Sequence, residues 1–332
     1  MAWLLRLSVL TIALALSVIM LGAYTRLTDA GLGCPDWPGC YGQFLAPNTS
    51  QAIAKANTDF PALPVEVKKA QTEMTHRYFA ESLGFFIILF AAIAHLKRRT
   101  LPLPRWLGPT LVLLVLFQGL LGMWTVTLRL LPLVVVGHLL GGFCTLALLW
   151  LAWLYLTSNK LTRFFPSPNV LRLGLLTLFV VLIQIALGGW TSANTAALIC
   201  GEFPTCQGVW FPELNFIQAF NLIGNMDAIG KTTVHMMHRL GALLILFLVS
   251  TLAVALWQQA KKIPAPAKNT LHRLSFVLIG LLILQIGLGI SNVLFFLPAT
   301  IAVAHNAVAA LLLLSLVALN FTLYQSARSP RV

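Results

Sequence analysis

The feature that most constrains this chain is a set of eight apolar stretches, each long enough to cross a lipid bilayer as a helix. A bilayer core needs about 20 mostly apolar residues per helix. Only 9% of the residues are charged and 58% are hydrophobic, whereas soluble domains carry about 25% charged residues. A soluble globular protein, a disordered chain and a disulfide-dense miniprotein are therefore excluded. We predict spans at 5–25, 77–96, 106–126, 132–156, 173–193, 236–257, 274–296 and 299–323.

The basic residues lie mostly on one side of these spans. That side, which holds both termini, carries fourteen Lys and Arg residues and no acidic residue. The opposite side and its span ends carry the other eight basic residues and all nine acidic ones. Short cytoplasmic loops are enriched in Lys and Arg, so both termini are predicted to be cytoplasmic. The net charge of +13 is then a topology signal and does not indicate a nucleic-acid-binding surface.

The first span is interpreted as a retained helix and not as a secretory signal. Arg6 precedes its apolar run, but the run is long for a signal and no small-x-small cleavage site ends it. No Arg/Ser-rich transit segment precedes it, which favours a protein of a bacterial inner membrane. Membrane lipid is accordingly an expected partner.

The two halves of the chain repeat one another. Five landmarks recur at offsets between 162 and 167 residues. They include a C-x5-C pair with an internal proline, at 34–40 and 200–206, in outer loops predicted at 26–75 and 194–234. Chance does not explain five such matches. The matched residues are Thr25 and Thr191, Cys34 and Cys200, His76 and His238, Gln118 and Gln285, and His138 and His305.

Each repeat holds four spans, an even number, so both repeats have the same orientation in the membrane. Such parallel repeats are related by an axis along the membrane normal. We therefore predict an all-α polytopic membrane protein built of two tandem four-helix bundles related by a pseudo-two-fold axis. The N-terminal bundle is expected at 1–160 and the C-terminal bundle at 161–332.

Four histidines lie near the outer ends of even-numbered spans: His76, His138, His238 and His305. An ionisable side chain in a span is costly and is a functional candidate, although a hydrogen-bonded interhelical histidine is the structural alternative. Two histidines per bundle at similar depth suit the axial positions of a heme iron. Zinc or copper would need further ligands, of which the spans supply few. We predict one bis-histidine heme site in each half.

Two kinds of neighbouring residue complete these sites. Arg77 and Arg239 directly follow the first histidine of each pair, where a guanidinium group either contacts a heme propionate or anchors the helix at the interface. Glu73 stands three residues before the first histidine of the N-terminal pair, whereas the corresponding residue of the other half is His235. Residues three apart share a helix face, so Glu73 either does chemistry beside the cofactor or is favoured there by the helix dipole. The asymmetry suggests chemistry in the N-terminal half and cofactor binding alone in the C-terminal half, and no role is predicted for His235.

The cysteine pairs Cys34/Cys40 and Cys200/Cys206 lie in outer loops that face an oxidising compartment, so two disulfides are predicted. Each closes a small loop, and such disulfides are structural or, when exposed, redox-active. The spacing is not typical of zinc sites. Cys144 lies inside the fourth span and is expected to be an inert core residue.

In this order and duplication the residues resemble those of the heme A synthase family, membrane enzymes that convert heme O to heme A for cytochrome oxidase. The resemblance covers nearly the whole chain and rests on the two repeats, the Glu-Met-Thr-His-Arg run at 73–77, the first cysteine pair and the remaining three histidines. It implies that His76 and His138 bind the substrate heme O, and that His238 and His305 bind one heme b.

The resemblance further implies oxidation of the C8 methyl group of heme O, through an alcohol, to a formyl group. Glu73 is implied as an acid–base or charge-stabilising residue, and Cys34 with Cys40 as a disulfide that helps to receive electrons. Family members differ in whether they have the second cysteine pair, which is present here. A heme O synthase and an electron acceptor are the implied protein partners.

Two other functions fit part of the pattern. A di-heme cytochrome b that passes electrons from quinol explains the four histidines but leaves the difference between Glu73 and His235 unexplained. A heme transporter or chaperone would bind heme transiently, but alternating access is helped by broken helices near the midplane. Here Gly and Pro gather mostly toward the outer span ends.

Overall fold

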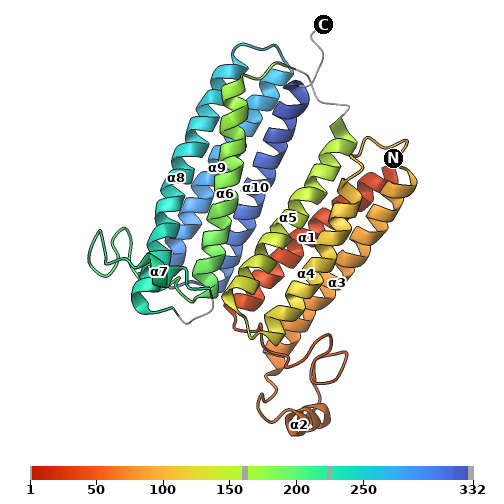
Figure 1. Ribbon diagram of the computed structural model, residues 1–332, viewed down its shortest axis with the longest axis vertical. Helices are drawn as coiled ribbons and strands as arrows, with labels where there is room; N and C mark the ends of the chain where they lie inside the picture. Colours follow the sequence, from red (N-terminus) through yellow and green to blue (C-terminus); the bar gives the residue numbers. More distant parts are fainter. Residues whose placement is uncertain (1, 159–163, 223–225, 328–332) are drawn as a thin grey trace.

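The computed structural model describes residues 2–158, 164–222 and 226–327, and the regular structure in these residues is helical (Figure 1). Eight of the described helices are long and apolar enough to cross a membrane, which confirms the prediction of an all-α, multi-pass membrane protein. Two short helices, α2 (Ser50–Asp59) and α7 (Phe216–Ala219), lie in the long connections. The eight long helices are α1 (Ala2–Leu27), α3 (Val67–Leu96), α4 (Leu107–Thr127), α5 (Pro132–Thr157), α6 (Pro168–Ala193), α8 (Ala228–Ala260), α9 (Ala267–Leu294) and α10 (Ala299–Ala327).

Helices α3 and α8 begin earlier than hydropathy predicts. Helix α3 starts at Val67, where position 77 was expected, and α8 starts at Ala228, where position 236 was expected. Hydropathy detects only the apolar part of a helix, whereas a 30-residue helix is about 45 Å long against a bilayer core of about 30 Å. The start of α8 is set by Asp227, whose side chain accepts a hydrogen bond from the Gly230 N–H at 2.7 Å, as an N-cap does. The polar first turns of both helices therefore extend beyond the apolar spans.

The long helices pack in two groups of four (Figure 1). In the first group α1 and α4 each pack on α3 and α5; in the second, α6 and α9 each pack on α8 and α10. Contacts of α10 with α1 and α5, and of α5 with α6, join the groups. The pseudo-two-fold relation between them stays a prediction, and the expected boundary between 160 and 161 lies outside the described residues.

The apolar core fills the half of the helices that lies away from the two long loops. The largest fully buried side chains include Phe90 on α3, Phe143 on α5 and Leu252 on α8. One cluster of buried residues runs through all eight long helices and joins both groups. The four histidines lie on the same helices nearer to the loops, so the loop-side half is where a cofactor can be placed.

The start of α1 and the end of α10 lie at the end of the molecule opposite to α2 and α7 (Figure 1). An even number of spans requires this arrangement. The cytoplasmic location of that end stays a prediction from charge. Of the basic residues that support it, four lie outside the described residues: Lys160, Arg163, Arg328 and Arg331.

The predicted orientation can be tested by labelling. In intact spheroplasts a membrane-impermeant maleimide should label Gln51→Cys on α2 and should not label Lys262→Cys in the turn between α8 and α9, because the basic turns lie in the cytoplasm. Both positions are exposed, and Cys144→Ser removes the free cysteine. After permeabilisation both variants should be labelled. Labelling of Lys262→Cys in intact spheroplasts would reverse the orientation.

Candidate functional site

Four half-buried histidines face one another in pairs. His76 on α3 and His138 on α5 are close enough for their ring charges to interact, and the same holds for His238 on α8 and His305 on α10. Among the described helices, α3 does not pack on α5 and α8 does not pack on α10, so each pair meets diagonally across the interior of its group. The structure thus brings together the two histidines that the sequence analysis assigns to each half.

A glycine on a neighbouring helix makes room for each histidine ring. A Cβ atom added to these glycines would lie 3.0 to 3.5 Å from the Cε1 atom of the ring. At the three closest glycines an added Cβ would force the ring to shift, and at Gly122 it would be in van der Waals contact with the ring. The pairs are Gly22 with His76, Gly122 with His138, Gly188 with His238, and Gly289 with His305.

The two histidine pairs differ in their polar partners. Gln184 on α6 donates from Nε2 to the backbone carbonyl of His238 at 2.8 Å and contacts Nδ1 of that ring at 3.1 Å. Gln285 on α9 contacts Nε2 of His305 at 3.2 Å. In the N-terminal pair, Nδ1 of each ring is buried and has no hydrogen-bond partner in the described part of the chain. Sequence reasoning missed Gln184. The repeat contained a signal, because an offset of 166 residues places this polar side chain of the fifth span opposite Val18 of the first span.

These features fit axial ligands of heme iron. Two imidazole rings face each other across each interior, Nδ1 of His76, His138 and His305 has no hydrogen-bond partner among the described residues, and the glycines leave the space that the rings need. Within the described ranges, no three His, Cys, Asp or Glu side chains gather to hold a bare metal ion, as a zinc site would require. The residues present therefore fit two heme groups better than zinc or copper.

Glu73 on α3 is buried, and both of its carboxylate oxygens accept hydrogen bonds. Oε1 accepts from Nη2 of Arg77, and Oε2 accepts from the backbone N–H of Cys34 at 2.9 Å. The side chains of Glu73 and Arg77 are only 5% and 9% exposed. A buried charge is tolerated when it is paired and hydrogen-bonded. The two side chains therefore stabilise each other, one turn apart on the same helix.

Both arginines hold the disulfide loops to the helices. Arg77 donates to three carbonyl groups of the first loop and Arg239 to four of the second, and these bonds fix the loop backbone over the helix ends. The heme-propionate contact of either arginine stays a prediction. The accepting carbonyls are those of Asp36, Pro38 and Gly39 at 2.6 to 3.3 Å, and of Cys200, Glu202, Pro204 and Thr205 at 2.7 to 3.3 Å.

Both predicted disulfides are present. Cys34 is bonded to Cys40 and Cys200 to Cys206, with Cα atoms 4.8 and 4.7 Å apart. All four cysteines are 0% exposed, so neither bridge is of the exposed kind that exchanges readily with thiols. A reagent can reach these sulfur atoms only after the loop opens. Cys144 on α5 is free and half-buried.

His235, for which the sequence predicts no role, has a structural one. Its ring is buried, and Nδ1 donates a hydrogen bond to the carbonyl of Ala196 at 3.0 Å. His235 and Glu73 therefore each hold the loop of their own half. Only the N-terminal half, however, places a carboxylate three residues before a paired histidine.

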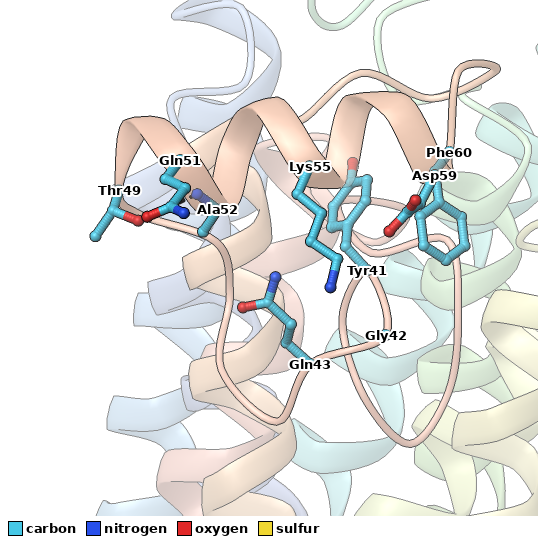
Figure 2. Close-up of a pocket in the computed structure, with 9 residues that line it drawn as sticks. All are labelled: Tyr41, Gly42, Gln43, Thr49, Gln51, Ala52, Lys55, Asp59 and Phe60. Carbon is cyan, nitrogen blue, oxygen red and sulfur yellow. Dashed lines mark hydrogen bonds between the residues drawn. The ribbon is translucent and has the colours of Figure 1, made fainter.

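A hollow in the first loop lies apart from the histidines. Figure 2 shows it between α2 and the segment 41–43, with Lys55 and Asp59 among its lining side chains. Tyr41 also lines it, and burial, assisted by nearby carboxylates, raises the pKa of its phenol. The phenol is thus protonated at neutral pH. Because none of the described lining residues is His or Cys, we assign this hollow no part in heme binding.

Comparison with known proteins places this geometry in a family context. A family model described as "Cytochrome oxidase assembly protein" matches residues 5–317. A heme A synthase of Shewanella oneidensis is 44% identical, with 99% of this chain and 98% of that protein covered. Heme A synthases of Neorickettsia sennetsu and of Chelativorans sp. are each 27% identical; the matches cover 91% and 90% of this chain, and 93% and 84% of those proteins.

The buried ion pair makes a prediction about stability. Arg77→Gln leaves the Glu73 carboxylate buried without its cation, which costs about 3–5 kcal/mol, so the thermal unfolding temperature of the purified protein should fall clearly. Arg239→Gln is the matched control, because it removes bonds to loop carbonyls but leaves no buried carboxylate unpaired. Adding Glu73→Gln to Arg77→Gln should recover part of the loss. An equal or larger fall for Arg239→Gln would contradict this account.

Proposed function

This chain belongs to the family of cytochrome oxidase assembly proteins, and we propose on that basis that it acts as a heme A synthase. It is then an oxidoreductase of heme A formation, with heme O as its substrate. We propose further that the C8 methyl group of heme O is oxidised, through an alcohol, to a formyl group. Heme A made in this way serves cytochrome oxidase assembly.

One observation supports our assignment of the chemistry to the N-terminal half. Glu73 is buried three residues before His76, while the C-terminal half has His235, whose ring is bonded to a loop carbonyl. In this proposal His76 and His138 bind heme O across the interior of the first helix group.

The carboxylate of Glu73 is fixed in place before substrate binds. Hydrogen bonds from Arg77 and from the Cys34 N–H hold its two oxygens, so little reorganisation is needed during the reaction. From this position Glu73 either stabilises positive charge that develops during oxidation of the methyl group or accepts the proton that is lost. Arg77 acts through Glu73 and is a positioning residue.

We assign one heme b to the C-terminal half, with His238 and His305 as its ligands. The contact of Gln184 with the His238 ring fixes the orientation of that imidazole, as hydrogen bonds to a ligand ring do in other metal sites. When bound, heme b supplies one-electron transfer. We propose that the Cys34–Cys40 disulfide helps to receive electrons, which pass on to a separate acceptor.

We propose a bacterial inner-membrane location with both termini in the cytoplasm and with the heme sites and cysteine pairs toward the outer face. The N-terminal bundle (1–160) and the C-terminal bundle (161–332) are then related by a pseudo-two-fold axis along the membrane normal. A heme O synthase is the proposed protein partner, because an insoluble substrate is best passed on within the membrane.

The function is tested by expression in a host that makes heme O but no heme A, followed by extraction and chromatography of the hemes. Heme A or its alcohol precursor should appear with the intact chain. Recovery of only heme b and heme O from a well-folded preparation would overturn the proposal. That result would favour a di-heme cytochrome b that passes electrons without modifying heme.

The role of Glu73 gives a sharper prediction. Glu73→Gln keeps the shape of the side chain and its ability to hydrogen-bond, so bound heme should be retained while conversion falls by at least about 100-fold. Heme content is measured from the Soret absorbance and conversion from the extracted hemes. His235→Gln is the matched control and should convert normally. If Glu73→Gln loses all bound heme, the residue is structural.

The division between the halves is tested with the histidines. His238→Ala should deplete heme b first, because it removes one of the two ligands proposed for that cofactor. His76→Ala, at the corresponding position of the other half, should leave heme b in place and abolish conversion. Unchanged heme b content in His238→Ala would refute the division.

A further inference from the structure

The connection between α6 and α8 carries a group of exposed apolar side chains around α7. We define the α7 patch as Trp210, Phe211, Phe216, Ile217 and Phe220. Phe211 and Ile217 are 94% and 86% exposed. Extended apolar patches of this kind mark interaction surfaces. The sole charged residue between 209 and 222 is Glu213.

Contacts of α7 place it at the outer ends of the spans. Ala219 is 0% exposed and belongs to the same buried cluster as Val136 on α5. The Ala219 carbonyl accepts a hydrogen bond from the indole N–H of Trp190 on α6 at 2.8 Å. Val136 lies four residues inside the span predicted at 132–156, and Trp190 lies three residues inside the span predicted at 173–193. Helix α7 therefore lies at the depth of the bilayer boundary.

The orientation of α7 is fixed by hydrogen bonds to its own turn and to α8. The Asn215 N–H donates to Oγ1 of Thr233 on α8 at 2.8 Å, and the Asn215 side chain accepts from the Gln218 N–H at 3.1 Å. Because the side of α7 that carries Ala219 is buried, the side chains of Phe216 and Ile217 remain exposed. In Figure 1, α7 lies beside the end of α8 and its connection spreads sideways, whereas α2 lies beyond the helix ends.

Lipid is the occupant that this surface fits. The exposed side chains of Leu240, Leu243 and Phe247 on α8 continue an apolar surface into the depth of the bilayer. Aromatic side chains are enriched at the membrane–water interface, and apolar segments that lie in the membrane plane insert about 5–10 Å into the headgroup–acyl boundary. Because no Lys or Arg lies between 209 and 222, insertion would depend on apolar contact and not on anionic lipid.

We propose that the α7 patch inserts into the headgroup–acyl boundary of the leaflet on the loop side and anchors the α6–α8 connection to lipid. This anchor is distinct from the spanning helices, since it lies in the membrane plane. It holds the connection that precedes His235 and His238 on α8. The lipid contact does not depend on any heme chemistry.

The proposal is tested with fluorescent labels on the full chain in nanodiscs of zwitterionic lipid. Ile217→Cys carries the label in a Cys144→Ser background, and Gln51→Cys on α2, which is also exposed, is the matched control. Lipids with a spin label near the headgroup should quench the label at position 217 at least about twofold, and iodide should quench it little. The label at position 51 should show the opposite pattern.

Phe211→Cys provides a second, independent position in the patch. A monodisperse elution profile and an unchanged unfolding temperature show that each variant is folded. Strong quenching by iodide at positions 217 and 211, equal to that at position 51, would overturn the proposal in favour of an aqueous loop. Quenching by neither agent in nanodiscs would also overturn it, because protein, such as a second copy of this chain, would then cover the patch.

Discussion

The bilayer core contains no water to satisfy a backbone group or a charge, and this constraint organises the whole chain. The spans are helical because a helix satisfies its backbone internally. The charged residues Glu73, Arg77 and Arg239 lie near the loop-side ends of their helices, where partners exist. Glu73 is paired there with Arg77, and Arg239 is satisfied by loop carbonyls. The same constraint makes the four paired histidines costly, which marks them as candidate functional residues.

The two halves share one scaffold, and under the proposed function they perform two different tasks. Each half has a pair of histidines with glycines beside their rings, an arginine and a small disulfide loop. The differences lie in a few side chains. Glu73 has no carboxylate counterpart, and Gln184 on α6 corresponds to Val18 in the first half. One pair is thus accompanied by a buried carboxylate and the other by amide groups that fix the rings. These differences are consistent with a reacting substrate on one side and a resident cofactor on the other.

Much of the fold and part of the site could be predicted from the sequence, because both follow from patterns along the chain. Apolar length locates the eight spans, and the repeat offset matches His76 with His238 and His138 with His305, so that each half holds two of the four histidines. The early starts of α3 and α8 were not predicted, because hydropathy does not detect the polar turns of a helix. The hydrogen bonds from Arg77 to the loop carbonyls were not predicted for another reason. These carbonyls lie some forty residues earlier in the chain, and only the folded loop brings them to the guanidinium group.

The continuous apolar core that joins both helix groups lies in the half of the molecule opposite the loops. The packed core is therefore separate from the part of the protein that holds the four paired histidines. Under the proposed function, the substrate site can be empty between turnovers while the packed core keeps the helices in place. Exchange of a large apolar ligand would then involve the loop-side half of the helices and leave the packed core unchanged.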